Sequence, residues 1–188
     1  MNMNYFLKIT SKPSFPIVYD NNNGINGSYI ATGKYIREEV NVPLKYNDAQ
    51  NSDVNFEKLL SYDVLQSVGG GWLVSQRLVE IIEQNFPNEV QLFKTIFNYK
   101  NNPCDSYCAI NVYNRIGCYD MDKSIYAVHP VDSSYKFSKI VLKTEPLEEY
   151  GMIYNIVRNS FDNKIIVSEK FMQIIKLNKI NSMSFKKE

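Results

Sequence analysis

The sequence predicts a single α+β domain in which a mainly antiparallel, twisted sheet carries two or three packed helices. Its 188 residues suit one domain with a core, because 44% of them are hydrophobic and 22% are charged. The middle of the chain consists of short extended segments separated by turn residues, which favours antiparallel pairing. Helical spacing of apolar residues occurs in only a few segments. We therefore treat residues 1–188 as one domain.

The first third of the chain indicates short extended pieces followed by a helix. YFLKIT (5–10) and VPLKY (42–46) are strand candidates, with a turn-rich, asparagine-rich loop between them. Over residues 52–65, apolar side chains fall on one helical face, and Ser52 or Asp53 can cap the first turn. The residues of this face are Phe56, Leu59, Leu60 and Val64.

The middle of the chain alternates with the period of a strand. YCAINVYNRI (107–116) predicts a half-buried strand, with Asn114 as the polar exception on its apolar face. That face contains Cys108, Ile110, Val112 and Ile116. SIYAVH, KIVLK and MIYNIVR are further strand candidates, over 124–129, 139–143 and 152–158.

One segment of the chain is repeated. LVSQRLVEIIEQN (73–85) resembles IVSEKFMQIIKLN (166–178) at a constant offset of 93 residues. Each copy predicts a short strand, a serine that caps an amphipathic helix, an asparagine with positive φ at the helix end, and a second strand. The serines are Ser75 and Ser168, the asparagines Asn85 and Asn178. Two amphipathic helices can resemble each other by chance, but the shared serine and asparagine favour an internal strand–helix–strand duplication.

The glycine-rich GGGWLVSQRL (69–78) raises the possibility of a phosphate-binding loop. A dinucleotide fingerprint that begins at Gly69 requires glycine at position 74, where the chain has Val74, and no P-loop spacing fits either. The second copy of the repeat has no glycine before its serine. We therefore expect the glycines to bend the backbone, or to let it approach a neighbour closely, before Trp72 packs in the core.

Histidine and cysteine do not form a convincing catalytic or metal site. His129, the only histidine, precedes Pro130 and is expected at a strand end, and no G-x-S-x-G nucleophile motif occurs. Cys104, Cys108 and Cys118 could join His129 in a zinc site, but they lack the C-x-x-C spacing. We therefore expect no metal and no cofactor.

Two acidic clusters remain to be explained. Asp120, Asp122 and Ser124 begin like a calcium loop, but Ile125 occupies the position of the required glycine, so an acidic turn is expected. The second cluster surrounds Pro146 and indicates either a solvated loop or a docking surface for a basic partner. Because no arrangement of residues supports catalysis, we expect a binding protein and not an enzyme.

Charge and targeting features indicate a cytoplasmic protein. The net charge of +1 provides no general attraction for nucleic acid. Residues 38–63 carry a net charge of −4 and residues 164–188 one of +4, which we interpret as solvated faces or, for the acidic segment, a docking patch. The sequence shows no export signal and no apolar run long enough for a membrane span, and the three cysteines are expected to be free thiols.

Three segments in a characteristic order resemble a known family. They are GGGWLVSQRLVEIIEQNFPNEVQLF, YCAINVYNRIGCYDMDKSIYAV and the stretch from FSKIVLKTEP to INSMSF. The shared motifs fall on Val74–Ser75 with Leu78, Asn111–Val112, Cys118 to Ser124, Lys139 to Leu142, and Val167–Ser168 with Phe171. In these motifs the chain resembles the eleventh immunity family of bacterial polymorphic toxin systems, formerly a domain of unknown function. Residues 67–188 match best, and residues 1–66 are divergent.

The resemblance implies a protein that binds a cognate toxin effector domain and neutralises it by stoichiometric occlusion, with no catalytic residues. Polarity and expected exposure select the toxin contacts, which are Tyr113, Tyr119, Asp120, Asp122, Glu145, Glu148 and Glu149. We expect a monomer or weak homodimer that binds neither nucleic acid nor membranes. The alternatives are a small enzyme or ligand-binding domain with a pocket on the sheet, and a self-associating scaffold protein.

Overall fold

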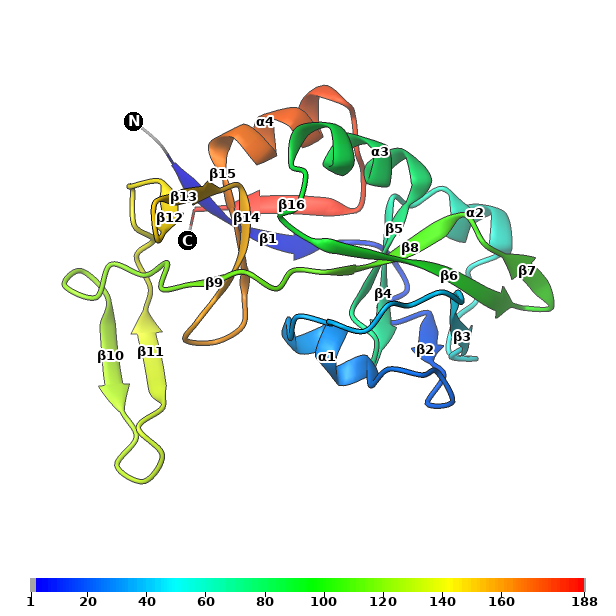
Figure 1. Cartoon of the computed structure of the whole chain (residues 1–188), viewed down its shortest axis with the longest axis horizontal. Coiled ribbons are helices and arrows are strands. Elements are labelled where there is room, and N and C mark those ends of the chain that lie inside the picture. Colours follow the sequence, from blue (N-terminus) through cyan, green and yellow to red (C-terminus); the bar gives the residue numbers. More distant parts are fainter. Residues whose placement is uncertain (1–2, 188) are drawn as a thin grey trace.

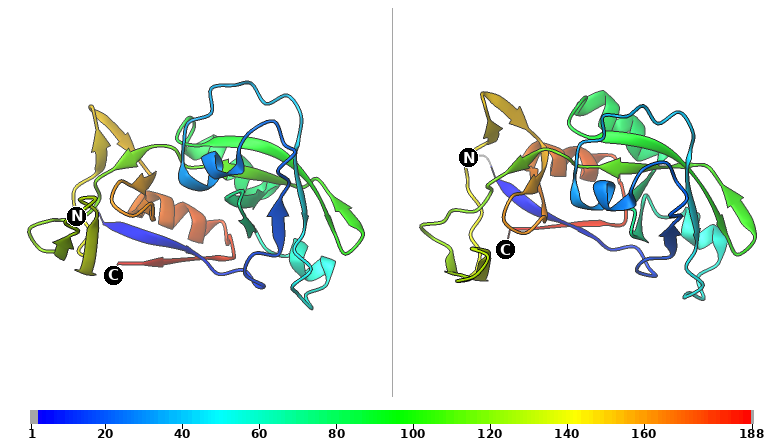
Figure 2. Two further views of the ribbon diagram at one scale, coloured as in Figure 1. Left: turned by 90° about the horizontal axis from the view of Figure 1, so that it is seen from below. Right: turned by 60° about the horizontal axis from the view of Figure 1, so that its bottom comes forward.

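Two main β-sheets, two separate hairpins and four helices make up residues 3–187, which are the residues that the computed structural model describes (Figure 1). The mixed content of helices and strands agrees with the predicted α+β class. The sheets meet near the centre of the molecule, and the two longest helices lie together on one side of it (Figures 1 and 2).

The larger sheet closes into a six-stranded barrel, whereas the sequence predicts an open twisted sheet. β3 pairs with both β2 and β6, so the strand order β3–β2–β4–β5–β8–β6 returns to its start. The bounds are Ile17–Tyr19 for β2, Leu44–Asp48 for β3, Val64–Val68 for β4, Trp72–Ser75 for β5, Gln91–Tyr99 for β6 and Tyr107–Asn111 for β8, while β7 (Asn102–Cys104) forms a hairpin with β6. Closure also requires two parallel pairs, β2–β4 and β3–β6, which local sequence patterns do not reveal.

The glycine-rich loop packs against tyrosines of the barrel interior. Gly69 and Gly71 have φ angles of +80° and +76°, so both turn the chain between β4 and β5. A Cβ atom on Gly70 would lie 2.6 Å from the ring of Tyr19 and 2.7 Å from that of Tyr46. The expected bend and close approach are therefore both confirmed.

The helices of the first third of the chain are short. α1 (Gly27–Thr32) is capped by Asn26, in a region expected to be a loop. The helix expected over 52–65 is only α2 (Phe56–Leu60), and its cap is Asn55, not Ser52 or Asp53. Val64 belongs to β4, because the chain turns from helix to barrel strand at Ser61 to Asp63.

The second sheet has the strand order β16–β1–β15–β14–β9. Its strands are β1 (Asn4–Ile9), β9 (Arg115–Ile116), β14 (Ile156–Asn159), β15 (Ile165–Ser168) and β16 (Met183–Lys186). The single strand predicted over 107–116 is in fact β8 of the barrel and β9 of this sheet. β8 is buried on both faces, not half-buried, because Tyr107 and Ala109 face the barrel core while Cys108 and Ile110 face the helices.

The repeated sequence forms two units with the same pairing. The strands β4–β5–β8–β6 and β14–β15–β1–β16 are antiparallel throughout, and α3 (Gln76–Asn85) and α4 (Glu169–Leu177) follow β5 and β15. The register also agrees, since Leu92 pairs with Ile110 and the equivalent Phe185 pairs with Leu7. Together the units build the core between the helices and both sheets.

The predicted helix caps are partly confirmed. Ser75 Oγ accepts a hydrogen bond from the Leu78 amide, and Ser168 Oγ accepts one from the Phe171 amide. Neither Asn85 nor Asn178 has positive φ. Each instead donates from its side-chain amide to the carbonyl four residues earlier, at 2.8 and 2.9 Å. The asparagines therefore satisfy helix-end carbonyls by their side chains.

Two hairpins project from the end of the molecule opposite β7 (Figures 1 and 2). One consists of β10 (Ile125–Val128) and β11 (Tyr135–Lys139), the other of β12 (Leu147–Glu149) and β13 (Met152–Tyr154). Of the strand expected over 139–143, only Lys139 lies in a strand, at the end of β11, and Leu142 forms an isolated bridge with Tyr119. The strand expected over 152–158 divides into β13 and β14, because the chain leaves the hairpin for the main sheet at Asn155.

Candidate protein-binding surface

Five of the seven residues expected to contact a partner line one hollow of about 660 Å³, with Tyr119 as its floor. Asp120 and Asp122 reach it from the turn after β9, and Glu145 and Glu148 from the segment that leads into β12. We call this feature the acidic hollow. Only one basic side chain, that of Lys143, is among the described residues that line it.

The acidic hollow has an ordered frame. The Asp120 carboxylate accepts hydrogen bonds from the backbone amide and the ammonium group of Lys123, at 3.2 and 2.6 Å, and these contacts hold the pKa of Asp120 below its usual value. The Asn4 side chain of β1 donates to the carbonyls of Lys143 and Glu145, at 2.8 and 2.9 Å. Both rims of the hollow are therefore fixed, one by its own turn and one by the main sheet.

The other two expected contacts, Glu149 and Tyr113, lie outside this hollow. Glu149 is exposed at the end of β12. Tyr113, which is half-buried, lies between β8 and β9; its hydroxyl donates to the Asn88 carbonyl at 2.6 Å and its ring meets Tyr35 edge-on. The expected exposure of Tyr119 is wrong, because its side chain is fully buried below the hollow and its hydroxyl donates to Asp162 at 2.6 Å.

Sequence reasoning missed the apolar side chains of the two hairpins. Six of them have between 52% and 91% of their surface exposed, and they are Ile125, Val128, Val131, Tyr150, Met152 and Ile153. All four residues of β10 are exposed. The only signal in the sequence is that the segment 125–128 lacks a polar face, which is equally typical of a buried strand.

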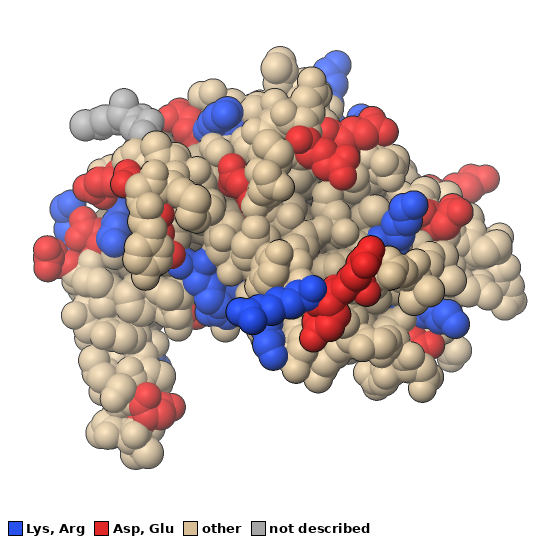
Figure 3. Space-filling view, viewed as in Figure 1, with Lys and Arg blue, Asp and Glu red and all other residues tan. Residues whose placement is uncertain are grey.

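The β10–β11 hairpin is held to the body by aromatic contacts. Tyr135 and Phe137 contact the ring of Phe161, with ring centroids 5.0 and 5.7 Å apart, and Phe137 also meets Tyr119 at 4.9 Å. Figure 3 shows the hairpin at lower left as mostly uncharged surface, while acidic and basic side chains gather above it, near β12 and β13. The apolar side chains and the acidic hollow thus lie at the same end of the molecule.

The residues considered for zinc are separated by the fold. Cys104, Cys108 and Cys118 are free, buried thiols, and burial raises the pKa of Cys118 to about 12. His129 lies at the exposed tip of the β10–β11 hairpin, with Nδ1 3.1 Å from Asp132. Among residues 3–187 no three His, Cys, Asp or Glu side chains are grouped as metal ligands would be.

No helix in the described part of the chain is both long and apolar enough to cross a membrane. A comparison with curated proteins finds no match. A comparison with protein families finds one over residues 45–188, from β3 of the barrel through β16, to the family described as Immunity protein family (Imm11). Because this match spans more than half of the chain, the protein belongs to the Imm11 immunity protein family.

Proposed function

We propose that this protein binds a cognate toxin domain of a bacterial polymorphic toxin system and neutralises it in the cytoplasm by stoichiometric occlusion. The observation that carries the proposal is the projecting end of the molecule, where two hairpins expose large apolar side chains beside the acidic hollow. Clustered apolar side chains with a charged rim are typical of protein interfaces. In a member of an immunity family, the expected partner of such a surface is a toxin.

The two parts of this surface have different roles. The apolar side chains of the hairpins, Val131 and Ile153 among them, lose contact with water when a partner covers them, which provides binding energy. The carboxylates of the hollow attract a basic patch and set its orientation, which accelerates association. An interface of about 1,600 Å² in total would suffice for a stable complex. The protein would act by covering the toxin, with no bond made or broken.

The test is co-expression with a candidate toxin domain, taken from the gene adjacent to that of this protein. The wild type is expected to restore growth and to form a 1:1 complex in gel filtration. The double variant Val128→Asp/Val131→Asp is expected to weaken the complex roughly 100-fold, because it places charges in the centre of the interface. Charge reversal by Glu148→Lys is expected to slow association, most clearly at low salt.

The matched controls are Val42→Asp and Leu177→Asp, which change apolar residues that are just as exposed but lie outside the hairpins. Both should bind the toxin like the wild type. If the Val128→Asp/Val131→Asp variant protects cells as well as the wild type and its circular dichroism spectrum is unchanged, the hairpins are not the toxin-binding surface. Failure of the folded wild type to form any complex with the toxin would refute the function itself.

A further inference from the structure

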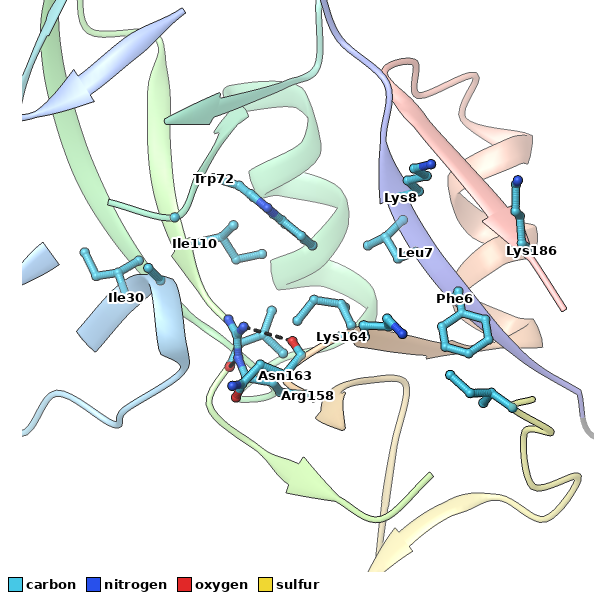
Figure 4. Close-up of a pocket in the computed structure, with 15 residues that line it drawn as sticks. Phe6, Leu7, Lys8, Ile30, Trp72, Ile110, Arg158, Asn163, Lys164 and Lys186 are labelled. Atoms are coloured by element: carbon cyan, nitrogen blue, oxygen red, sulfur yellow. Dashed lines mark hydrogen bonds between the residues drawn. The ribbon is translucent and has the colours of Figure 1, made fainter. Parts of the chain in front are cut away.

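A second cavity, of about 540 Å³, lies where the barrel meets the second sheet. Figure 4 shows Trp72 and Ile110 of the barrel on one side of it, and Phe6 and Leu7 of β1 on the other. Ile30 of α1 and Ile165 of β15 are also part of the apolar lining. The volume is that of an ordinary small-molecule site, for which about 300–1,000 Å³ is typical.

Arg158 of β14 is the unusual member of this lining. Only 8% of its surface is exposed, and it forms no ion pair with a carboxylate among residues 3–187. Its Nε donates to the Val112 carbonyl at 3.1 Å and its Nη1 to the Asn163 carbonyl at 3.2 Å. A guanidinium has five N–H donors, so three remain without a partner in the described chain. A buried charge without a counter-ion is costly, and burial and the charge of Arg115 lower the pKa of Arg158 to about 10.

All of the charged residues that line the cavity are basic. Lys8, Lys164 and Lys186 also line it, and none of its lining residues is acidic. Lys164 is partly neutralised by Asp162, whose carboxylate is 2.8 Å from its ammonium nitrogen. Lys8 and Lys186 form no ion pair with the residues that the structure describes. The cavity therefore combines an apolar body with an uncompensated positive charge.

We propose that this cavity binds a small amphipathic anion, namely an aliphatic carboxylate whose head group pairs with Arg158 and whose chain lies against Trp72, Ile110 and Leu7. A carboxylate can accept two hydrogen bonds from one guanidinium, which would satisfy the free donors and the charge together. The apolar lining accounts for the chain, since burying each methylene group is favourable. This site is separate from the hairpin surface and does not depend on toxin binding.

The test uses decanoate as the probe and methyl decanoate as its uncharged match. Trp72 is the only tryptophan of the chain and lines the cavity, so its fluorescence reports binding without a label. Decanoate is expected to change the emission in a saturable way with 1:1 stoichiometry in calorimetry. Methyl decanoate should bind at least about 10-fold more weakly, because a charged hydrogen bond to the guanidinium is lost.

Two variants locate the site without removing Arg158, whose loss could unfold the protein. Lys8→Glu/Lys186→Glu reverses the charge at the rim, and Ala31→Phe fills the cavity from α1. Both should weaken decanoate binding at least 10-fold. The matched control Lys176→Glu/Lys179→Glu makes the same charge change at exposed residues outside the cavity and should bind normally.

The proposal is overturned if decanoate gives no saturable signal, if the methyl ester binds as tightly, or if the control variant is impaired as much as the rim variant. Binding of an acidic toxin segment here, in place of the carboxylate, would also overturn it and would appear as loss of toxin protection in the rim variant. We expect the rim variant to protect cells normally. A failure of decanoate to bind would therefore leave the toxin-binding proposal intact, and a failure to bind the toxin would leave the cavity proposal intact.

Discussion

Asp162 connects the candidate surface to the core. Its carboxylate accepts hydrogen bonds from the Tyr119 hydroxyl at 2.6 Å and the Asn159 amide at 2.8 Å, and it pairs with Lys164. Burial raises the pKa of Asp162, but the hydrogen bonds from Asn159, Lys164 and Tyr119 outweigh it, so that the pKa lies below 3.8. Tyr119, the floor of the acidic hollow, is thus held in place by a charged acceptor.

We predict that Asp162→Asn lowers the free energy of unfolding at pH 7 by about 1–3 kcal/mol, because hydrogen bonds to a charged acceptor are lost. The folded pKa lies below the unfolded value of 3.8, so the carboxylate stabilises the fold above about pH 4 and ceases to do so as the pH falls through the folded pKa. The gap between variant and wild type should therefore narrow in acid. Urea titrations at several pH values measure it, with Asp122→Asn, an exposed change, as the control. Equal stability at pH 7 would contradict the prediction.

Single residues also show what sequence can predict about the surface. Acidic residues are expected to be exposed whatever the fold, which is why Asp122, Glu145 and Glu148 were placed correctly on the surface. Tyr119 and Val131 have side chains that suit either core or surface, and only the tertiary structure buries the first and exposes the second. The apolar part of the candidate site was therefore not predictable from residue type.

At the scale of elements, the repeated units also contain some features that local sequence predicts and others that only the tertiary structure decides. The serine caps and amphipathic helices are local features, so α3 and α4 could be predicted closely. The third strand of each unit could not be assigned, because β8 follows β6 in one unit whereas β1 lies at the start of the chain in the other. The shared register supports internal duplication over chance resemblance.

The caps of the two units make an equivalent set of contacts. The amide of Ser75 donates to the Asp63 carbonyl and its hydroxyl to the Asp63 carboxylate at 2.9 Å; Ser168 makes the same pair with Asn155, the second at 2.8 Å. We predict that Ser75→Ala and Ser168→Ala each lower the stability by about 1–2 kcal/mol, since each removes a cap and leaves a polar neighbour short of a donor, namely the buried Asp63 or the half-buried Asn155.

Thermal and urea unfolding of the two cap variants measure these changes. Ser134→Ala, in the exposed tip of the β10–β11 hairpin, is the control and should change the stability by less than about 0.5 kcal/mol. A large effect at one cap and none at the other would show that the two units are not equivalent in energy, whatever their common register.

At the scale of the whole molecule, the family match and the fold have different boundaries. The match begins at residue 45, yet β1 lies between β15 and β16, and β2 closes the barrel between β3 and β4. Long-range pairing of this kind leaves no local trace in a sequence, so neither the closed barrel nor the central place of β1 could be predicted. The α+β class could be, because it depends on the local patterns alone.

We predict that residues 45–188, expressed alone, do not fold. Without β1, the backbone edges of β15 and β16 are unpaired, and the main core loses Tyr5 and Leu7. Without β2 and α1, the barrel opens and its interior loses three more buried side chains, those of Ile17, Tyr19 and Ile30. Unpaired edges and an exposed core favour aggregation over a native state. Circular dichroism and gel filtration should show a disordered or aggregated product, and co-expression with residues 1–44 should restore the fold.

The matched control shortens the β10–β11 hairpin, a peripheral element whose two strands pair only with each other. Replacing residues 128–135 by Asn-Gly shortens the β10–β11 hairpin but leaves both main sheets complete, so this variant should fold and unfold cooperatively. Because the hairpin belongs to the proposed toxin surface, the same variant should fail to protect cells. A native-like, cooperatively unfolding fragment 45–188 would show that the matched region folds without β1 and that the first 44 residues serve binding and not folding.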